Sequence, residues 1–337
     1  MKSPLYLCQF IRSFFQDYLI CQRNMSNDTV QSYRDATKLF IAFIAGRIKR
    51  TPAKLLVTDI TPKGIVDFLQ HLENTRRNSI PTRNHRLIVL RRIFEYISLQ
   101  EPSLIDHCRG LLSVPLKRDS TYPEICYLDK QELGALFDVI DVRTVIGRRD
   151  HALLLFMYNT GARVTEAANS IVEWVSLQPP YKVEILGKGR KWRTCPLWKS
   201  TVVALKTVLS DRGTTVRPDD HLFTNRFGKP LSRFGIRNTI TKYKNKAALQ
   251  RPSLRNKTVT PHTLRHTTAM HLLQSGVEIN VIRSWLGHVK LETTHRYAEI
   301  DLAMKAKALE ACELTETYTS SKRWRSNPDI LKWLESL

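Results

Sequence analysis

One stretch of alternating residues interrupts a chain that otherwise shows helical patterns. In "YKVEILGKGRKWRTCPL", Val183 and Ile185 alternate with polar residues, a Gly-Lys-Gly turn follows, and a second run ends at Pro196. Alternation with a period of two is typical of a half-buried strand, and two such runs around a glycine turn predict a β-hairpin with Lys188 at or beside its tip. Because helices are predicted on both sides of this hairpin, we expect a mainly α chain with a small antiparallel β-sheet, an α+β fold.

Capping signals and apolar periodicity predict helices in the first hundred residues. Ser26 and Asn27 can cap one helix, which Gly46 would end, and Thr61 followed by Pro62 marks the start of another. The apolar faces of three successive helices are expected to consist of Tyr33, Phe40 and Phe43; of Ile65, Phe68, Leu69 and Leu72; and of Leu87, Leu90, Phe94 and Ile97.

Composition shifts divide the chain into four parts. Residues 111–124, "LLSVPLKRDSTYPE", contain two prolines and no period, which indicates a linker. It separates a helical domain at 1–110 from a second domain at 125–310, and residues 311–337 form a C-terminal tail and helix. These four ranges are the predicted domain organisation.

The second domain is expected to begin with two capped helices. Asp129 can cap the first, with Glu132 three residues later, and the second covers "RRDHALLLFMYNTG" and stops at Gly161. Helices return after the hairpin, from residue 198 onward.

The charge of the chain points to a polyanionic partner. The net charge is +22 and the pI about 9.9. Residues 1–118 contribute +10 and the remainder +12, so both halves are basic, as expected if both contact the same nucleic acid. Six scattered cysteines suggest neither a zinc knuckle nor a disulfide framework. No apolar run reaches the roughly 18 residues that a membrane span needs. We therefore expect a soluble, cytoplasmic, nucleoid-associated protein.

The densest group of reactive side chains lies near the C-terminus. A helix starting at Pro261 would project His262, Arg265 and His266 from one side, because they stand at i, i+3 and i+4, and Gly276 would close it. The histidines of this helix lack a cysteine or carboxylate partner at ligand spacing, so we expect no metal and no cofactor.

Two further short helices are predicted to follow. One covers residues 278–286 and ends at Gly287, which leaves His288 in a turn. Thr293 can then cap a third helix that presents Tyr297 in its second turn. Taken alone, Tyr297 would more often be a core residue than a catalytic one.

This set of residue types suits phosphoryl transfer at a DNA strand. A phosphodiester gathers charge on its non-bridging oxygens in the transition state, and fixed guanidinium groups can neutralise that charge without a metal. The attacking group must be an oxygen able to form a phosphoester, and the departing sugar oxygen needs a proton. A tyrosine supplies the first, and a mobile lysine such as Lys188 can supply the second.

These motifs resemble the tyrosine recombinase/integrase superfamily, of Xer-like, phage or transposon integrase type. "HTLRHTTAMHLL" is similar to the family's His-x-x-Arg box, "WLGH" precedes the second histidine, and "TTHRYAE" carries the tyrosine. "RRDHALLLFMYNTGARVTEAAN" is similar to the first arginine box, and "ILGKGRKWRTCPL" to the lysine hairpin. The helical first domain resembles the core-binding (SAM-like) domain. The resemblance implies a catalytic set of Arg163, Lys188, His262, Arg265, His288 and Tyr297.

The resemblance also implies roles for these residues. Arg163, Arg265 and the two histidines would hold the scissile phosphate of double-stranded DNA, and Lys188 would protonate the leaving 5′ oxygen. Tyr297 would become a 3′-phosphotyrosine. The implied activity is site-specific recombination, integrating or transposing a mobile element, by a homotetramer on two recombination sites, with or without companion recombinases.

Basic residues outside the catalytic set are candidates for binding DNA. A solvated helix face would account for the arginines of the helix around residue 90, but basic faces also suit a DNA clamp, because phosphates are met by Arg and Lys. The predicted contacts are Arg83, Arg86, Arg91 and Arg92, then Lys117 and Arg118, then Arg190, Lys191 and Arg193.

Three other functions stay open at this point. They are Xer-type resolution of chromosome or plasmid dimers, DNA binding without turnover, and type IB topoisomerase activity. The final segment "NPDILKWLESL" has an apolar face on a short helix, which either folds onto its own body or passes to a neighbouring protomer.

Overall fold

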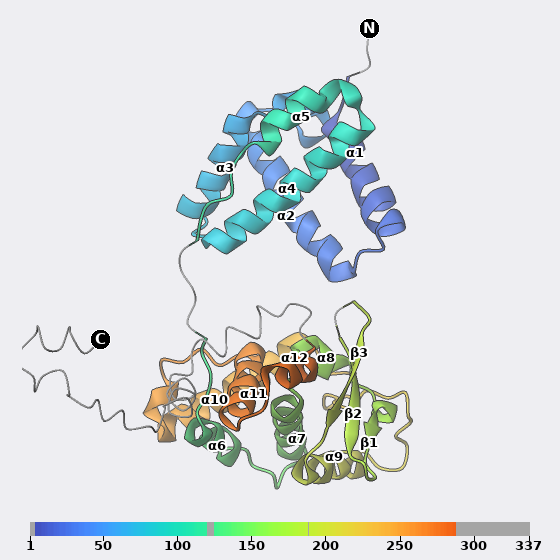
Figure 1. Ribbon diagram of the computed structural model, residues 1–337, viewed down its shortest axis with the longest axis vertical. Helices are drawn as coiled ribbons and strands as arrows, with labels where there is room; N and C mark the ends of the chain where they lie inside the picture. The colour runs from blue at the N-terminus through green and yellow to red at the C-terminus, as the bar shows by residue number, and fades with distance from the viewer. Residues whose placement is uncertain (1–3, 120–124, 188, 288–337) are drawn as a thin grey trace, which may run out of the picture. The chain divides into compact units, whose positions relative to one another are not determined.

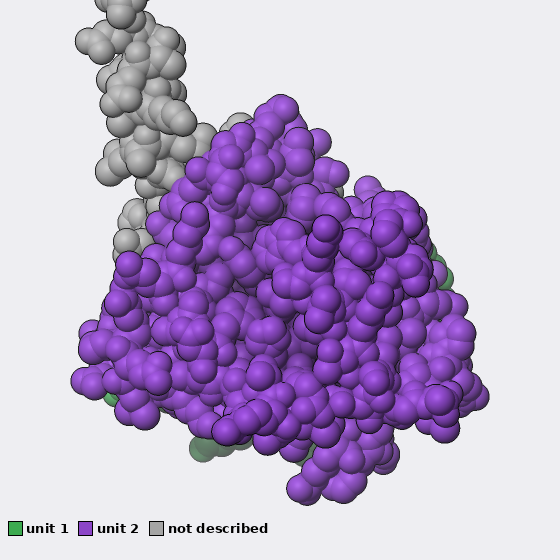
Figure 2. Space-filling model, turned by 90° about the horizontal axis from the view of Figure 1, so that it is seen from below, with its two compact units in different colours: residues 1–123 green, residues 124–337 purple. Residues whose placement is uncertain are grey.

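The chain forms two compact units, residues 1–123 and 124–337 (Figures 1 and 2). The computed structural model describes residues 4–119, 125–187 and 189–287. Each unit has its own apolar core. The observed mixture of helices with one small antiparallel sheet confirms the α+β fold. No described helix has both the length and the apolar character needed to cross a bilayer.

The described secondary structure of the first unit is helical, apart from one isolated antiparallel bridge between Tyr6 and Leu56. As predicted, Ser26 caps one helix by accepting a hydrogen bond from Thr29 N, and Thr61 caps another with Pro62 in its first turn. Its elements in chain order are α1 (Leu7–Ser13), the π-helix η1 (Phe14–Gln22), α2 (Asn27–Ile48), the short 3-10 turns η2 (Pro52–Lys54) and η3 (Val57–Asp59), α3 (Pro62–Asn74), α4 (Ile80–Gln100), η4 (Pro102–Leu104) and α5 (Ile105–Leu112).

Two boundaries in this unit differ from the sequence prediction. Helix α2 runs past Gly46 and ends at Lys49, which adopts the left-handed conformation with φ 52°. The helix continues because Ile48 still packs against the core, which offsets the helix-weakening glycine. The connecting stretch also starts later than residue 111. Leu111 lies within α5, and both Leu111 and Val114 are buried in the first core.

The second unit combines helices with the predicted hairpin. Asp129 caps its first helix and Glu132 reaches back to Asp129 N, as the sequence indicates. Its elements are α6 (Lys130–Asp138), α7 (Val145–Thr160), α8 (Val164–Asn169), η5 (Val172–Trp174), β1 (Val175–Ser176), β2 (Lys182–Leu186), β3 (Trp192–Pro196), α9 (Lys199–Asp211), α10 (Arg233–Gln250), η6 (Pro252–Leu254), α11 (Pro261–Gln274) and α12 (Ile279–Leu286).

The sheet has the order β1-β2-β3, and both pairings are antiparallel. Val183 lies opposite Cys195, and Ile185 lies opposite Arg193. Val183, Ile185 and Cys195 are buried, so alternate residues face the core as the sequence predicted. The two-residue strand β1 was not predicted, because two residues are too few to show a period.

Helix α7 organises the second unit. It packs against α9 on one side and α11 on another, and α12 packs against both α11 and β3 (Figure 1). Helix α7 ends at Gly161, whose φ is 59°, and a Cβ at this position would collide with Leu286 of α12. Glycine is therefore required both by the backbone conformation and by the close approach of α12.

Candidate active site

Arg265 connects the carboxyl ends of two helices. It is 3% exposed, and its guanidinium donates to Gly161 O at 2.6 Å, just after α7, and to Leu286 O at 2.5 Å, at the end of α12. The last carbonyls of a helix lack partners within the helix and carry partial negative charge, so a cation is stabilised there. Arg265 is thereby oriented by backbone atoms.

Arg163 is the N-cap of α8 and stands three residues after Thr160, the last residue of α7. Its backbone N donates to Glu166 Oε2 at 2.8 Å, and its side-chain Nη1 donates to Glu166 Oε1 at 2.6 Å. Glu166 is buried, whereas the side chain of Arg163 is 27% exposed. One end of the guanidinium is therefore held while part of it faces solvent. Glu166 was not singled out from the sequence, although its position three residues after a helix start is the signal of a capping carboxylate.

Arg193 shares the same carboxylate. Its Nη2 donates to Glu166 Oε2 at 2.7 Å, and its Nε donates to Trp285 O at 2.9 Å. Burial by itself would raise the pKa of Glu166, but the hydrogen bond and charge of Arg193, together with the bonds from Arg163, lower that pKa to about 2. Through these bonds, the side chains of Arg163, Glu166 and Arg193 connect α8 and β3 with the backbone of α12.

His262 occupies the first turn of α11 and is exposed at the surface of the helix. Desolvation by the atoms packed around the ring, followed by the charges of Arg265 and Arg163, lowers the pKa of His262 below its ordinary value. The imidazole is consequently neutral at pH 7. His262 stands one turn before Arg265 on α11, and Arg265 binds Gly161 O, two residues before Arg163, so the three predicted residues lie near one another.

A cavity of about 380 Å³ opens beside His262. Its lining includes Val164 from α8 and the side chains of Arg233, Phe234 and Arg237 from the first turns of α10. These three α10 residues are exposed, and Phe234 retains 78% of its surface. They were not predicted from the sequence, although an aromatic residue among arginines is typical of nucleic-acid surfaces.

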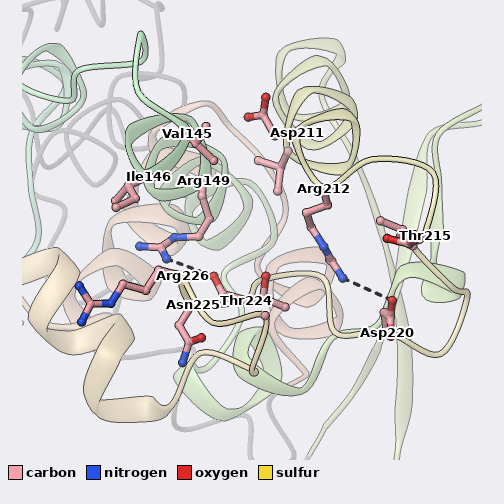
Figure 3. A pocket seen from close by; sticks show the side chains of 13 residues that line it. Val145, Ile146, Arg149, Asp211, Arg212, Thr215, Asp220, Thr224, Asn225 and Arg226 are labelled. Carbon is pink, nitrogen blue, oxygen red and sulfur yellow. Dashed lines mark hydrogen bonds and ion pairs between the residues drawn. The ribbon is translucent and has the colours of Figure 1, made fainter.

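Another cavity, of about 430 Å³, contains none of the predicted catalytic residues (Figure 3). It lies by the amino-terminal part of α7, whose 16 residues separate its two ends by roughly 24 Å. Two of the three arginines that line it bind neighbouring groups: Arg149 donates to Thr224 O at 3.1 Å, and Arg212 pairs with Asp220 at 3.5 Å. Among the described residues, no group of three His, Cys, Asp or Glu side chains could hold a metal ion.

Three predicted catalytic residues lie outside the described residues: Lys188, His288 and Tyr297. The structure does describe the chain on either side of Lys188, and Gly287, the residue before His288, adopts a φ of 64° that ends α12 as predicted. Of the six predicted catalytic residues, the described ones are Arg163, His262 and Arg265, and the structure brings these three together.

The residues predicted to contact DNA occupy different environments. Arg83 is 9% exposed and pairs with Glu73 at 3.3 Å. Arg91 donates to Val114 O at 2.5 Å, and Arg193 is held as described above. Half-buried Arg86 donates to Asn78. Lys117 pairs with Glu73, and Arg92 pairs with Glu95. The exposed members are Arg92, Lys117, Arg118, Arg190 and Lys191.

Comparison with known proteins identifies the family. The Phage integrase family model matches residues 126–304, more than half of the chain, and that of the phage integrase N-terminal SAM-like domain matches residues 13–101. Tyrosine recombinase XerD of Staphylococcus epidermidis is 31% identical over 294 residues, covering 85% of this chain and 92% of its own. The chain belongs to the phage integrase family of tyrosine recombinases.

Other relatives agree with this assignment. The Sinorhizobium fredii protein y4rC, whose name describes an integrase/recombinase, is 37% identical to this tyrosine recombinase over 339 residues, the full length of both chains. XerH site-specific recombinase bound to palindromic difH substrate has the same fold, with a TM-score of 0.70, 21% identity and coverage of 93% of this chain and 98% of that one. The predicted fold and membership of the superfamily are confirmed. The tyrosine recombinase cleaves and rejoins DNA strands in site-specific recombination.

Proposed function

We propose that this recombinase cleaves one DNA strand through Tyr297 and integrates or transposes a mobile element. The phenolic oxygen of Tyr297 attacks the scissile phosphorus and forms a 3′-phosphotyrosine bond. The bond from phosphorus to the 5′ oxygen breaks, its electron pair goes to that oxygen, and the ammonium of Lys188 supplies a proton. Rejoining reverses these steps, so the reaction needs no ATP.

The clustering of Arg163, Arg265 and His262 is the observation that carries this proposal. Two guanidinium groups held by backbone and carboxylate oxygens can neutralise a phosphate whose negative charge increases in the transition state. Because they are already oriented, little reorganisation is needed when the charge develops. His288 completes this phosphate-binding set.

His262 is suited to a second task. A neutral imidazole has one nitrogen that donates and one that accepts, so it can bind a phosphate oxygen and take the phenolic proton. The lowered pKa of His262 keeps the ring in this neutral form at pH 7. The proton released by Tyr297 is therefore assigned to His262.

The biological role is drawn from the relatives. One solved structure of the same fold, with a TM-score of 0.68 and 14% identity, covers 92% of this chain and 99% of its own; it is the Tn1549 transposon integrase in complex with transposon right end DNA. The identity of 30–31% to XerC and XerD proteins favours a second candidate, resolution of chromosome or plasmid dimers. Either role places the enzyme in the cytoplasm with the nucleoid, as a tetramer on two sites, with or without companion recombinases.

Trapping the covalent intermediate tests the proposal. Cells making the protein are lysed under denaturing conditions, and the DNA that stays joined to the protein is sequenced. We expect discrete sites at the ends of a mobile element, and a nicked duplex of the recovered site should give the same adduct in vitro. A single chromosomal site would favour dimer resolution, and scattered sequences would favour topoisomerase activity.

Tyr297→Phe should abolish the adduct while leaving DNA binding intact, because only the nucleophilic oxygen is removed. Tyr181→Phe is the matched control, since Tyr181 packs partly buried against the core of the second unit, and it should form the adduct normally. EDTA should leave cleavage unchanged. Persistence of the adduct in Tyr297→Phe contradicts the assignment, and retarded DNA without any adduct from the wild type indicates a binding protein.

A further inference from the structure

Arg193 belongs to the hairpin, but its guanidinium group is buried within the second unit. It follows Trp192 on β3 and lies opposite Ile185, close to the turn that contains Lys188. Its side chain is only 8% exposed and contacts Glu166 of α8 and Trp285 O of α12. Two of its three guanidinium nitrogens, Nε and Nη2, are therefore engaged in holding β3 to α12 and α8.

The ion pair between Arg193 and Glu166 lies against the base of the hairpin turn. A Cβ at Gly187, the residue before Lys188, would lie 3.4 Å from Arg193 Nη1 and 3.5 Å from Glu166 Oε1. Gly187 N also donates to Lys191 O at 2.8 Å across the turn. The backbone that leads to Lys188 is therefore packed directly on this ion pair.

Arg163 does not depend on Arg193 for its orientation. It keeps a side-chain bond to Glu166 Oε1 and a backbone bond to Glu166 Oε2, whereas Arg193 uses only Oε2 and the carbonyl of Trp285. Loss of Arg193 would remove its bonds from β3 to α8 and α12 but leave Arg163 paired. Loss of Glu166 would release both arginines.

We propose that Arg193 is a positioning residue that holds the hairpin so that Lys188 can protonate the leaving 5′ oxygen. This inference rests on the proposed function, in which Lys188 is the proton donor. It replaces the prediction that Arg193 binds DNA. In this proposal, the Arg193–Glu166 pair positions the hairpin so that the lysine can act beside the phosphate that Arg163 contacts.

A change of leaving group isolates this role. In a 5′-bridging phosphorothioate, the bond from phosphorus to sulfur breaks and its electron pair goes to a thiolate, which leaves without needing a proton. Single-turnover cleavage of the recovered site is measured with saturating enzyme on the oxygen and sulfur substrates. We expect Arg193→Gln to slow cleavage of the oxygen substrate about 10- to 100-fold, since general acids contribute about 10²- to 10⁴-fold and the lysine is displaced rather than lost.

The ratio of sulfur to oxygen cleavage rates is the decisive quantity. In Arg193→Gln this ratio should rise by about the same 10- to 100-fold, and in Lys188→Ala, where the proton donor is lost, it should rise by about 10²- to 10⁴-fold. Because both rates come from one preparation, the ratio is independent of the fraction of protein that is folded. Arg193→Lys keeps the charge and should lie between the wild type and Arg193→Gln.

Three other variants separate the alternatives. Glu166→Gln should slow the sulfur substrate as well, because Arg163 loses its partner. Thr194→Ala, an exposed neighbour on β3, should leave both rates unchanged. Arg190→Gln, which is exposed on the turn, should reduce the slope of log affinity against log salt by about 0.9, the value for one phosphate contact, whereas Arg193→Gln should keep the wild-type slope.

The outcomes distinguish this inference from the proposed function. Equal slowing of both substrates by Arg193→Gln, or a smaller salt slope in that variant, overturns the positioning role while the recombinase mechanism stands. Lys188→Ala with an unchanged ratio removes the lysine as proton donor, and the role of Arg193 falls with it. A wild-type protein that forms no adduct refutes the proposed function itself.

Discussion

Glu166 shows how one buried side chain can organise a site. Its carboxylate accepts hydrogen bonds from Arg163 and Arg193 and is almost completely removed from water. An isolated buried carboxylate would be strongly destabilising, but two guanidinium groups make the charged form favourable. The same pairing stabilises the fold and orients the groups that we assign to catalysis.

The lowered pKa of Glu166 predicts a pH-dependent stability. Its pKa is about 2 in the folded protein against 4.5 as reference, so the stabilisation is fully present above pH 4.5 and is lost as pH falls toward 2. A shift of this size corresponds to about 3 kcal/mol. We expect Glu166→Gln to unfold about 3 kcal/mol more easily at pH 7, with a difference that shrinks as the pH is lowered from 4.5.

Urea unfolding followed by tryptophan fluorescence measures this effect. All six tryptophans of the chain lie beyond residue 123, so the signal reports on the second unit. Exposed Glu173, replaced by Gln, is the matched control and should change stability little at any pH. A Glu166→Gln deficit that is the same at pH 7 and pH 3 would argue against a carboxylate stabilised in its charged form.

At the level of secondary structure, the site is built where helix ends meet. The carboxyl ends of α7 and α12 converge on Arg265, and Arg163, the N-cap of α8, stands two residues after Gly161. Unpaired carbonyls attract the cation, and the free amide groups at the start of α8 attract the carboxylate of Glu166. Short helices with tight joints thereby place charged side chains at one location.

This arrangement predicts a specific effect of Gly161→Ala. Alanine would adopt the left-handed conformation at a cost of about 1–2 kcal/mol and would also collide with Leu286, so we expect a loss of more than 2 kcal/mol in stability. Gly213→Ala is the matched control, because Gly213 has φ 79° with no atom near its Cβ position, and it should lose only the backbone contribution. Equal losses in the two variants, measured by urea unfolding, would show that α12 does not pack on the end of α7.

At the scale of the whole molecule, both units carry excess positive charge. Residues 1–123 carry a net charge of +9 and residues 124–337 carry +13, which is consistent with two units that act on the same DNA. Phosphate contacts supply much of the affinity but no base information, so the charge does not specify the target site. The proposed assembly of protomers across two sites is a separate matter.

Deleting residues 328–337 should weaken the pairing of two sites while sparing DNA binding. The predicted helix in this segment, which lies outside the described residues, carries Ile330, Leu331, Leu334 and Leu337 on one face and is expected to dock on a neighbouring protomer. Gel shifts would follow binding, and paired-site complexes would follow synapsis. Serine at Leu331 and Leu334 should reproduce the deletion, whereas serine at Lys332 should not. Normal recombination by the truncated protein would exclude this role.

The sequence by itself determined where several described helices begin or end, and that the chain has a mainly helical fold. Capping at Ser26, Thr61 and Asp129 and the glycine stops at Gly161 and Gly287 are local signals, because they act within one turn of the backbone. Helix α2 shows the limit of such signals. Packing of Ile48 carried it past Gly46.

Only the tertiary structure decided what each charged side chain contacts. Arg190 and Arg193 look alike in the sequence, since both are basic residues of one hairpin, yet Arg190 is exposed and Arg193 is bound to Glu166 and Trp285 O. Arg83 and Arg91 likewise bind groups within their own unit. The physical reason is that the partners of a charged side chain are distant in sequence and are brought close only by packing. A local sequence pattern contains no information about them.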